Sequence, residues 1–181
     1  MPLRPDEERR VTQTWRLHAA SARRHLDCSP EAIRTGCGGC CCTTKAGRYW
    51  PPISCGTDNG VCPHLGPAGC RLGESRPVTC HLYPFKLNAM NTLVVHFWAL
   101  LAGCCHKNTH THRTAWESIR PSFELLFGTE QVERADEHLE SGVDAYFKVP
   151  EHIAHRYLLE AEWDREKVVP GPFDVHREGC D

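Results

Sequence analysis

Apolar residues near the start of the chain recur with the spacing of one helix face. The stripe consists of Val11, Trp15, His18, Ala22 and Leu26. This period of about 3.6 residues predicts an amphipathic helix over residues 5–27, and Pro5 suits its first turn. A second, short helix is expected from the Ser29-Pro30 step to Gly36.

A strand pattern follows in the middle of the chain. Segments 81–87 and 92–100 are rich in strand-forming residues and flank the connection 88–91, which reads Asn-Ala-Met-Asn. The pattern predicts an antiparallel hairpin. The longest apolar-rich run covers residues 93–102 and is shorter than the roughly 18 apolar residues of a membrane-spanning helix.

Helical periodicity returns in the C-terminal part. Thr114 precedes Glu117 by three residues, which is the spacing of a capping box. Two further helices are predicted over residues 129–139 and 150–163. Together these patterns predict an α+β fold: a small, loop-rich core with a short antiparallel hairpin, wrapped by N- and C-terminal helices.

The segment between these regions has a different character. Residues 36–80 are rich in Gly, Pro and Cys and show little periodicity, and a loop of this length is uncommon in a compact domain. Metal–thiolate bonds in place of an apolar core would explain it. We therefore divide the chain into an N-terminal helical segment (1–35), a cysteine-cluster metal-binding core (36–112) and a C-terminal helical extension (113–181).

Composition and charge narrow the class of partner and the compartment. The chain has 181 residues and a net charge of -2, with no long basic run, so neither a nucleic acid nor a membrane is expected as a partner. The N-terminal residues do not resemble a secretory signal, which favours a cytoplasmic location. In a reducing compartment, 12 cysteines favour metal binding or redox chemistry over disulfides.

The cysteines of the middle region gather in four short clusters. The clusters are Cys37-Gly-Gly-Cys40-Cys41-Cys42, Cys62 to Cys70, Cys80 with its neighbours, and Cys104-Cys105-His106. Two thiolates separated by two residues can hold one metal ion from a tight turn. Four such clusters within seventy residues together predict a metal centre.

The number and kind of metal stay open on this evidence. A zinc ion and a common iron–sulfur cluster each take four ligands, and the clusters offer more than four thiols. Two centres, or one centre with spare thiols, would both fit. Thiolates bind zinc and iron–sulfur clusters alike. His64, His81 or His106 could complete a zinc site, although a supporting or surface role is the more ordinary expectation for each.

The order of these residues resembles that of a known group, the YkgJ-type cysteine-cluster family of zinc- or iron-chelating domains. The matching elements are Cys62-Pro-His-Leu, Gly69-Cys70, Glu74-Ser-Arg-Pro-Val-Thr-Cys80 and Tyr83-Pro84. The resemblance implies a metal site built from Cys37, Cys40, Cys41, Cys62, Cys70, Cys80 and Cys104. It departs at Arg34, where the family has a cysteine; either Cys28 or Cys42 takes that ligand's place, or one site has lost a ligand. The last family-like cysteine falls at Cys104 or at Cys105.

Three functions are compatible with a thiolate centre. The first is a metal-binding protein whose metal builds the core and whose protein partner is unknown. The second is an iron–sulfur oxidoreductase or other iron–sulfur-dependent modifying enzyme, and the third a zinc enzyme with one open ligand position. The sequence contains no nucleotide-binding loop, nucleophile elbow or His-Glu-x-x-His motif. We rank the three functions in the order given.

Overall fold

The chain folds around a small sheet covered by helices. The computed structural model describes residues 14–32, 64–67, 69–96, 99 and 112–167. The predicted α+β class is confirmed, because these residues form six strands and several helices. In this part of the chain, no helix is long and apolar enough to cross a bilayer.

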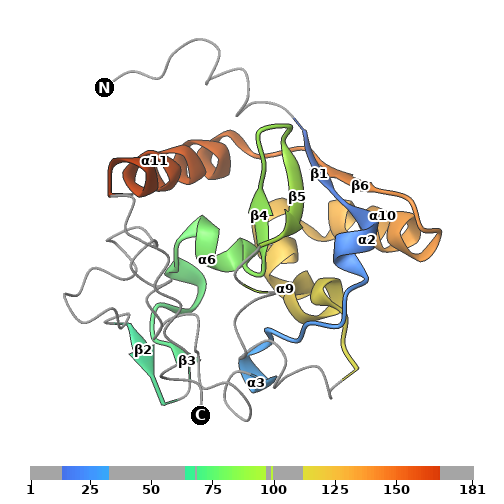
Figure 1. Cartoon of the computed structure of the whole chain (residues 1–181), viewed down its shortest axis with the longest axis horizontal. Helices are drawn as coiled ribbons and strands as arrows, with labels where there is room; N and C mark the ends of the chain where they lie inside the picture. Colours follow the sequence, from blue (N-terminus) through green and yellow to red (C-terminus); the bar gives the residue numbers. More distant parts are fainter. Residues whose placement is uncertain (1–13, 33–63, 68, 97–98, 100–111, 168–181) are drawn as a thin grey trace, which may run out of the picture.

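The main sheet has four strands in the order β4-β5-β1-β6 (Figure 1). β1 lies parallel to β5 and antiparallel to β6, and β4 and β5 form an antiparallel hairpin. The sheet therefore takes strands from all three predicted segments of the chain, while the division into those segments stays a prediction. The strands are β1 (Trp15–Leu17), β4 (Phe85–Leu87), β5 (Thr92–Val95) and β6 (Ala145–Phe147).

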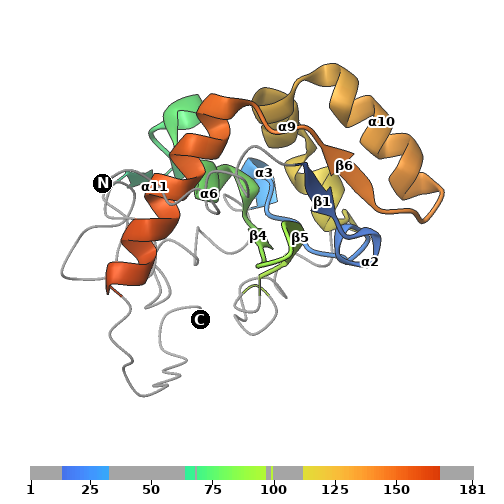
Figure 2. The ribbon, with the colours of Figure 1, turned by 90° about the horizontal axis from the view of Figure 1, so that it is seen from above.

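Helices and a second, two-stranded sheet complete the described structure. The helices are α2 (Ala19–Ala22), α3 (Pro30–Ala32), α6 (Val78–Leu82), α9 (Ala115–Phe127), α10 (Thr129–Glu140) and α11 (Glu151–Lys167). The remaining elements are the 3-10 helix η3 (Gly73–Ser75) and strands β2 (Leu65–Gly66) and β3 (Gly69–Cys70). Seen from above, α10 and α11 lie at opposite sides of the described structure, with α9 and α6 between them (Figure 2).

Aromatic side chains join the sheet to the long helices. The ring of Phe123 in α9 lies 5.2 Å from that of Phe147 in β6 and 5.3 Å from that of Trp116. Trp15 of β1, which is paired with Phe147 in the sheet, contacts Tyr157 of α11, with ring centroids 5.1 Å apart. Edge-to-face pairs of this kind stabilise a core beyond the area they bury. The core is thus formed by residues far apart in sequence.

The predicted N-terminal helix is wrong at residues 15–17, which form β1, and within the described residues it is confirmed only over the short helix α2. Trp15 and Leu17 are almost completely buried and Arg16 between them is not, which is the two-residue alternation of a strand. Arg16 instead donates to Thr92 and pairs with Asp144. The apolar pattern used to predict the helix did not include Leu17. Its burial beside Leu93 of β5 favours a strand here. The short helix after Ser29 is present, because Ser29 caps it through its hydroxyl.

The predicted hairpin is confirmed at its turn and shortened at both ends. Phe85 pairs with Val95 and Leu87 with Leu93, around a turn in which the Asn88 side chain accepts from two backbone amides. The strand predicted to begin at residue 81 is wrong at its start, because residues 78–82 form α6. The strand that follows the turn ends at residue 95.

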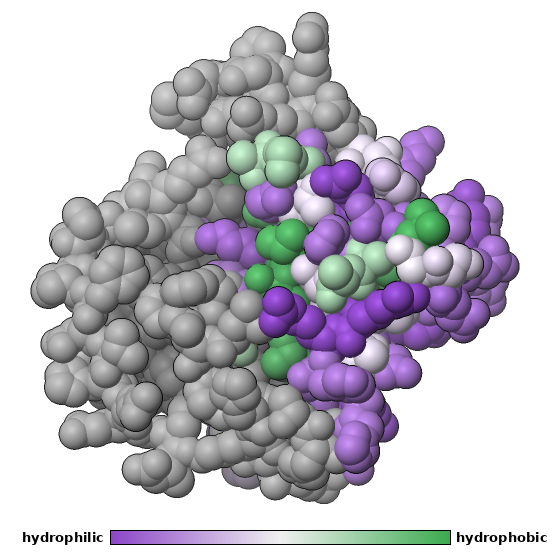
Figure 3. All heavy atoms as spheres, turned by 45° about the vertical axis from the view of Figure 1, so that its right-hand side comes forward, coloured by the Kyte–Doolittle hydropathy of each residue, from purple (hydrophilic) through white to green (hydrophobic). Residues whose placement is uncertain are grey.

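The C-terminal helices agree with the prediction. Thr114 and Glu117 form the complete capping box at the start of α9, and α10 and α11 follow where expected. Gly128 joins α9 to α10 with a φ of 86°, a conformation that side chains disfavour. Strand β6 was not predicted from the sequence. The face in Figure 3 is mostly hydrophilic over its described residues, as expected of a surface in water.

Candidate metal centre

Two of the seven predicted ligands lie in the described part of the chain. Cys70 is exposed at the end of β3, and Cys80 is half-buried in α6. Of the alternatives, Cys28 is half-buried just before α3. The remaining candidates lie outside the described residues: Cys37, Cys40, Cys41, Cys42, Cys62, Cys104 and Cys105.

The β2–β3 pair places two of the family-like elements side by side. Leu65 lies opposite Cys70 in the antiparallel register. Just beyond the pair, the Arg71 amide donates to the His64 carbonyl at 2.7 Å. The two strands of this small hairpin therefore bring Cys70 beside His64 and Leu65, the described residues of the preceding family-like element.

Cys80 sits on a short helix that is anchored in the core. Val78 and Leu82, one turn apart in α6, have exposed fractions of 0% and 1%. The Cys80 amide donates to the Pro77 carbonyl at 3.0 Å. Cys80 lies between these two buried residues in the helix, and its own side chain is half-buried.

Glu160 of α11 completes the first turn of α6. Its two carboxylate oxygens accept from the backbone amides of Val78, at 2.9 Å, and Thr79, at 2.8 Å. Glu160 is only 5% exposed. Sequence reasoning missed this residue, since a glutamate in a predicted helix gives no sign of a partner 82 positions away.

Arg76 joins the turn before α6 to two long helices. Its Nε donates to His81 Nδ1 at 3.0 Å and its Nη2 donates to Ser122 of α9 at 2.6 Å. The Arg76 carbonyl accepts from Arg156 of α11 at 3.3 Å. These contacts orient the turn before Pro77.

His81 is held as a neutral ring with both nitrogens engaged. Because Nδ1 accepts from Arg76, Nε2 carries the proton and donates to the Glu74 carbonyl at 3.1 Å. Burial, followed by the positive charge of Arg76, lowers the pKa of His81 to about 4. These contacts give His81 a supporting role and leave neither ring nitrogen for a metal. His64 is half-buried, and His106 lies outside the described residues.

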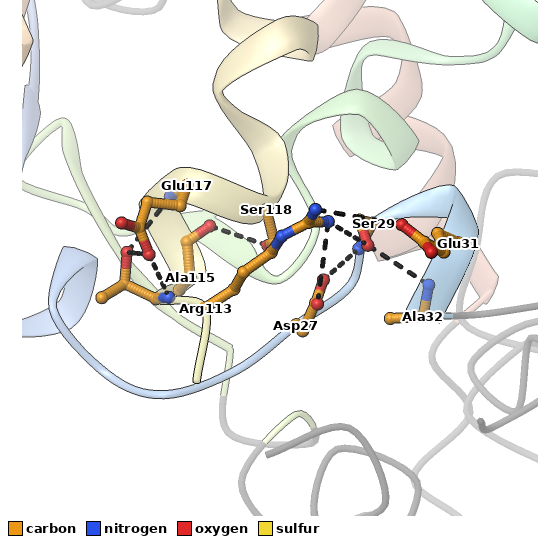
Figure 4. A network of polar contacts seen from close by, with 9 residues as sticks. Asp27, Ser29, Glu31, Ala32, Arg113, Ala115, Glu117 and Ser118 are labelled. Carbon is orange, nitrogen blue, oxygen red and sulfur yellow. Dashed lines mark hydrogen bonds and ion pairs between the residues drawn. The ribbon is translucent and has the colours of Figure 1, made fainter. Parts of the chain in front are cut away.

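A polar network joins the segment before the first cysteine cluster to the segment after the last one (Figure 4). Arg113 donates to the Ser29 hydroxyl at 3.2 Å and lies 3.9 Å from the carboxylates of Asp27 and Glu31. The Asp27 side chain is 2% exposed and accepts from the Ser29 amide at 2.9 Å. Residues 27–32 and 113 are therefore held against each other.

The described residues leave one hydrogen-bond donor unused beside Cys80. The Thr79 hydroxyl oxygen is buried and has no hydrogen-bond partner in this part of the structure. Thiolate and sulfide sulfur commonly accept such bonds around metal centres. Within the described residues alone, no three His, Cys, Asp or Glu side chains are grouped to hold an ion. A sulfur-ligated centre at Cys80 therefore stays a prediction, and the Thr79 hydroxyl is the described donor that such a centre would use.

An open groove of about 400 Å³ lies between η3, α6, α9 and α11. Its lining mixes apolar and ionisable side chains and includes Glu74, His81, Leu125, His152, Ile153 and Arg156. His81 contributes to this groove and directly follows Cys80 in the chain. The groove therefore borders the helix that carries the predicted ligand.

Comparison with known protein families, with curated proteins and with solved structures finds no match. The similarity to the YkgJ-type family stays a prediction from the sequence.

Proposed function

We propose that this chain is a cytoplasmic metal-binding protein whose clustered thiolates hold zinc or an iron–sulfur cluster. The observation that carries the proposal is the hydrogen bond between Arg71 and His64. Cys62 is two residues from His64, so their Cα atoms are at most about 7 Å apart. The His64 carbonyl in turn accepts from the amide of Arg71, the residue after Cys70. Two predicted ligands are thus tethered to one small hairpin.

The polar network around Arg113 supports the same convergence. Cys37 is five residues beyond Ala32, which limits their separation to about 18 Å at full extension. Cys104 is eight residues before His112, within about 29 Å. Since residues 27–32 and 113 are in contact, the first and last cysteine clusters start from neighbouring points on the fold.

When bound, such a centre would supply structural cross-links as zinc, or electron transfer as an iron–sulfur cluster. Cys70 and Cys80 are the described residues that would hold it. The contacts of β2–β3 and of α6 would position these two side chains, and binding of the metal would order the surrounding region further.

The groove beside His81 favours a second candidate, an iron–sulfur-dependent modifying enzyme. A concave site with apolar walls and a few ionisable groups, next to a redox centre, is the usual arrangement of a substrate site. The lining residues Glu74 and Arg156 would then bind polar groups of a substrate.

The test is metal analysis of protein purified without oxygen, combined with its visible spectrum. We expect close to stoichiometric zinc, or iron with equal sulfide and an absorbance band near 400 nm. A brown protein would favour the second candidate, and a colourless zinc protein the first.

Serine variants identify the ligands in the same experiment. Cys70→Ser and Cys80→Ser are each expected to lower the metal content sharply, because serine is a poor ligand for either metal. Cys180→Ser lies outside the four clusters and serves as the control. Equal metal content in all three variants would contradict the ligand assignment.

A further inference from the structure

We propose that Glu160 and Arg156 of α11 are positioning residues for the Cys80 thiolate, so that metal binding depends on the docking of α11. We call these two residues the α11 clamp. The inference rests on the proposed function and extends it from the ligands to the element that controls them. The reason is that α6 on its own would be unstable.

Helix α6 is too short to be stable without contacts from other elements. It has five residues, and its N-cap residue Pro77 makes no side-chain cap. The amides of the first turn of any helix lack partners within it, and a single turn is unstable in water. The Glu160 carboxylate accepts from two of these amides, those of Val78 and Thr79. The conformation of the turn leading into Cys80 is therefore set from α11.

The dependence is mutual because Glu160 is buried. A buried carboxylate is costly unless hydrogen bonds compensate its lost hydration. Its two oxygens are compensated by the α6 amides, at 2.9 and 2.8 Å. Undocking α11 would remove the cap of α6, and unravelling α6 would leave Glu160 without these donors. The two helices are thus expected to order together.

Arg156 holds the other end of the same turn through a backbone hydrogen bond. It precedes Glu160 by four residues, so both side chains lie on one face of α11. Arg156 donates to the Arg76 carbonyl, whereas Glu160 accepts from amides two and three residues later. The clamp therefore holds the backbone at both ends of residues 76–79, directly before the thiol.

Metal sites are sensitive to such positioning. Metal–thiolate bonds are about 2.3 Å long and tolerate errors of roughly 0.2 Å. Residues that orient ligands without touching the metal change affinity by about 10- to 100-fold when altered. Loss of the clamp is expected to act in this range, through the position of Cys80.

The test compares the Zn²⁺ affinity of the full-length wild type with that of Glu160→Gln. Zn²⁺ is the probe because thiolate sites bind it whichever metal they normally hold. The amide keeps the shape of the carboxylate but can accept only one of the two bonds. We expect at least a tenfold weaker affinity, measured by competition with a coloured chelator.

Two matched variants separate positioning from general destabilisation. Glu151→Gln changes an exposed glutamate at the start of α11, and Ile153→Val removes a methylene from the buried face of the same helix. Both are expected to bind Zn²⁺ within twofold of wild type. An affinity loss in Ile153→Val equal to that in Glu160→Gln would overturn the proposal, as would an unchanged affinity in Glu160→Gln.

If Glu160→Gln does not fold, a variant of Arg156, the exposed residue of the clamp, tests the proposal instead. Arg156→Ala removes a single surface contact and is expected to weaken Zn²⁺ binding about threefold. Wild-type affinity in Arg156→Ala would then overturn the proposal. A wild-type protein that binds neither zinc nor iron would instead refute the proposed function itself, and this inference with it.

Discussion

At the scale of single residues, the Thr79 hydroxyl is one of two buried side-chain polar groups without a hydrogen-bond partner among the described residues, the other being the Trp15 indole N–H. Thr79 directly precedes Cys80. Burying an unpaired hydroxyl costs about 1–3 kcal/mol. Thr79→Val should therefore stabilise the metal-free protein by about 1 kcal/mol, measured by urea unfolding. A loss of stability would show that the hydroxyl has a favourable partner in the metal-free protein.

The neutral state of His81 gives a prediction about pH. Burial, then Arg76, lowers its pKa from 6.5 to about 4, so the unfolded chain binds more protons than the folded one between these values. This contribution to stability is complete above about pH 6.5 and is lost as the pH falls toward 4. Its full size is on the order of 3 kcal/mol.

Urea unfolding of the metal-free protein at several pH values between 7 and 4.5 measures this effect. His96 adds to the slope, since burial and then Lys86 lower its pKa to about 4 as well. His81→Gln should flatten the dependence without removing it. An identical slope in wild type and His81→Gln would contradict the neutral assignment of His81.

The sequence identified Cys70 and Cys80 as candidate ligands, because they belong to short local motifs. It did not identify Glu160 or Ser122, which contact this region from 46 to 82 positions away. Only the packing of α9 and α11 brings them to α6. Local spacing carries no information on such contacts, and the supporting residues of a site are therefore the hardest part to predict.

At the scale of elements, local signals were most reliable where a helix supplies its own cap. The Thr114 hydroxyl accepts from the Glu117 amide at 3.2 Å, and the Glu117 carboxylate accepts from the Thr114 amide at 2.7 Å. Thr114→Ala should cost about 1 kcal/mol of the free energy of unfolding. Ser141→Ala, at the exposed end of α10, is the control and should change it little. Equal effects would contradict the role of the cap.

The elements that sequence reasoning missed are those that tertiary contacts create. β1 and β6 have three residues each, and α6 has five. Segments this short have little intrinsic preference, so their partners decide their conformation. Leu17 buried beside β5 makes a strand of a segment with helical spacing. The Glu160 carboxylate stabilises the first turn of α6, and the last residues of this helix were predicted to begin a strand.

At the scale of the whole molecule, the aromatic core and the predicted metal centre are separate sources of stability. The core joins the sheet to α9 and α11 through Phe123, Phe147 and Trp15. Removing the metal should therefore loosen the cysteine-bearing region and leave α9 and α10 folded. Hydrogen exchange with and without a chelator measures this: amides of residues 69–82 should exchange faster, and those of 115–140 should not. An equal loss of protection in both regions would contradict the view that the aromatic core and the metal centre stabilise the protein separately.

The central claim is that thiolates from separated parts of the chain converge on one inorganic centre. X-ray absorption at the zinc or iron edge of the purified protein tests it most directly, since it reports the atoms bound to the metal. The account predicts a shell dominated by sulfur at about 2.3 Å, reduced in Cys80→Ser. A protein without bound metal, or a shell of nitrogen and oxygen alone, would contradict it.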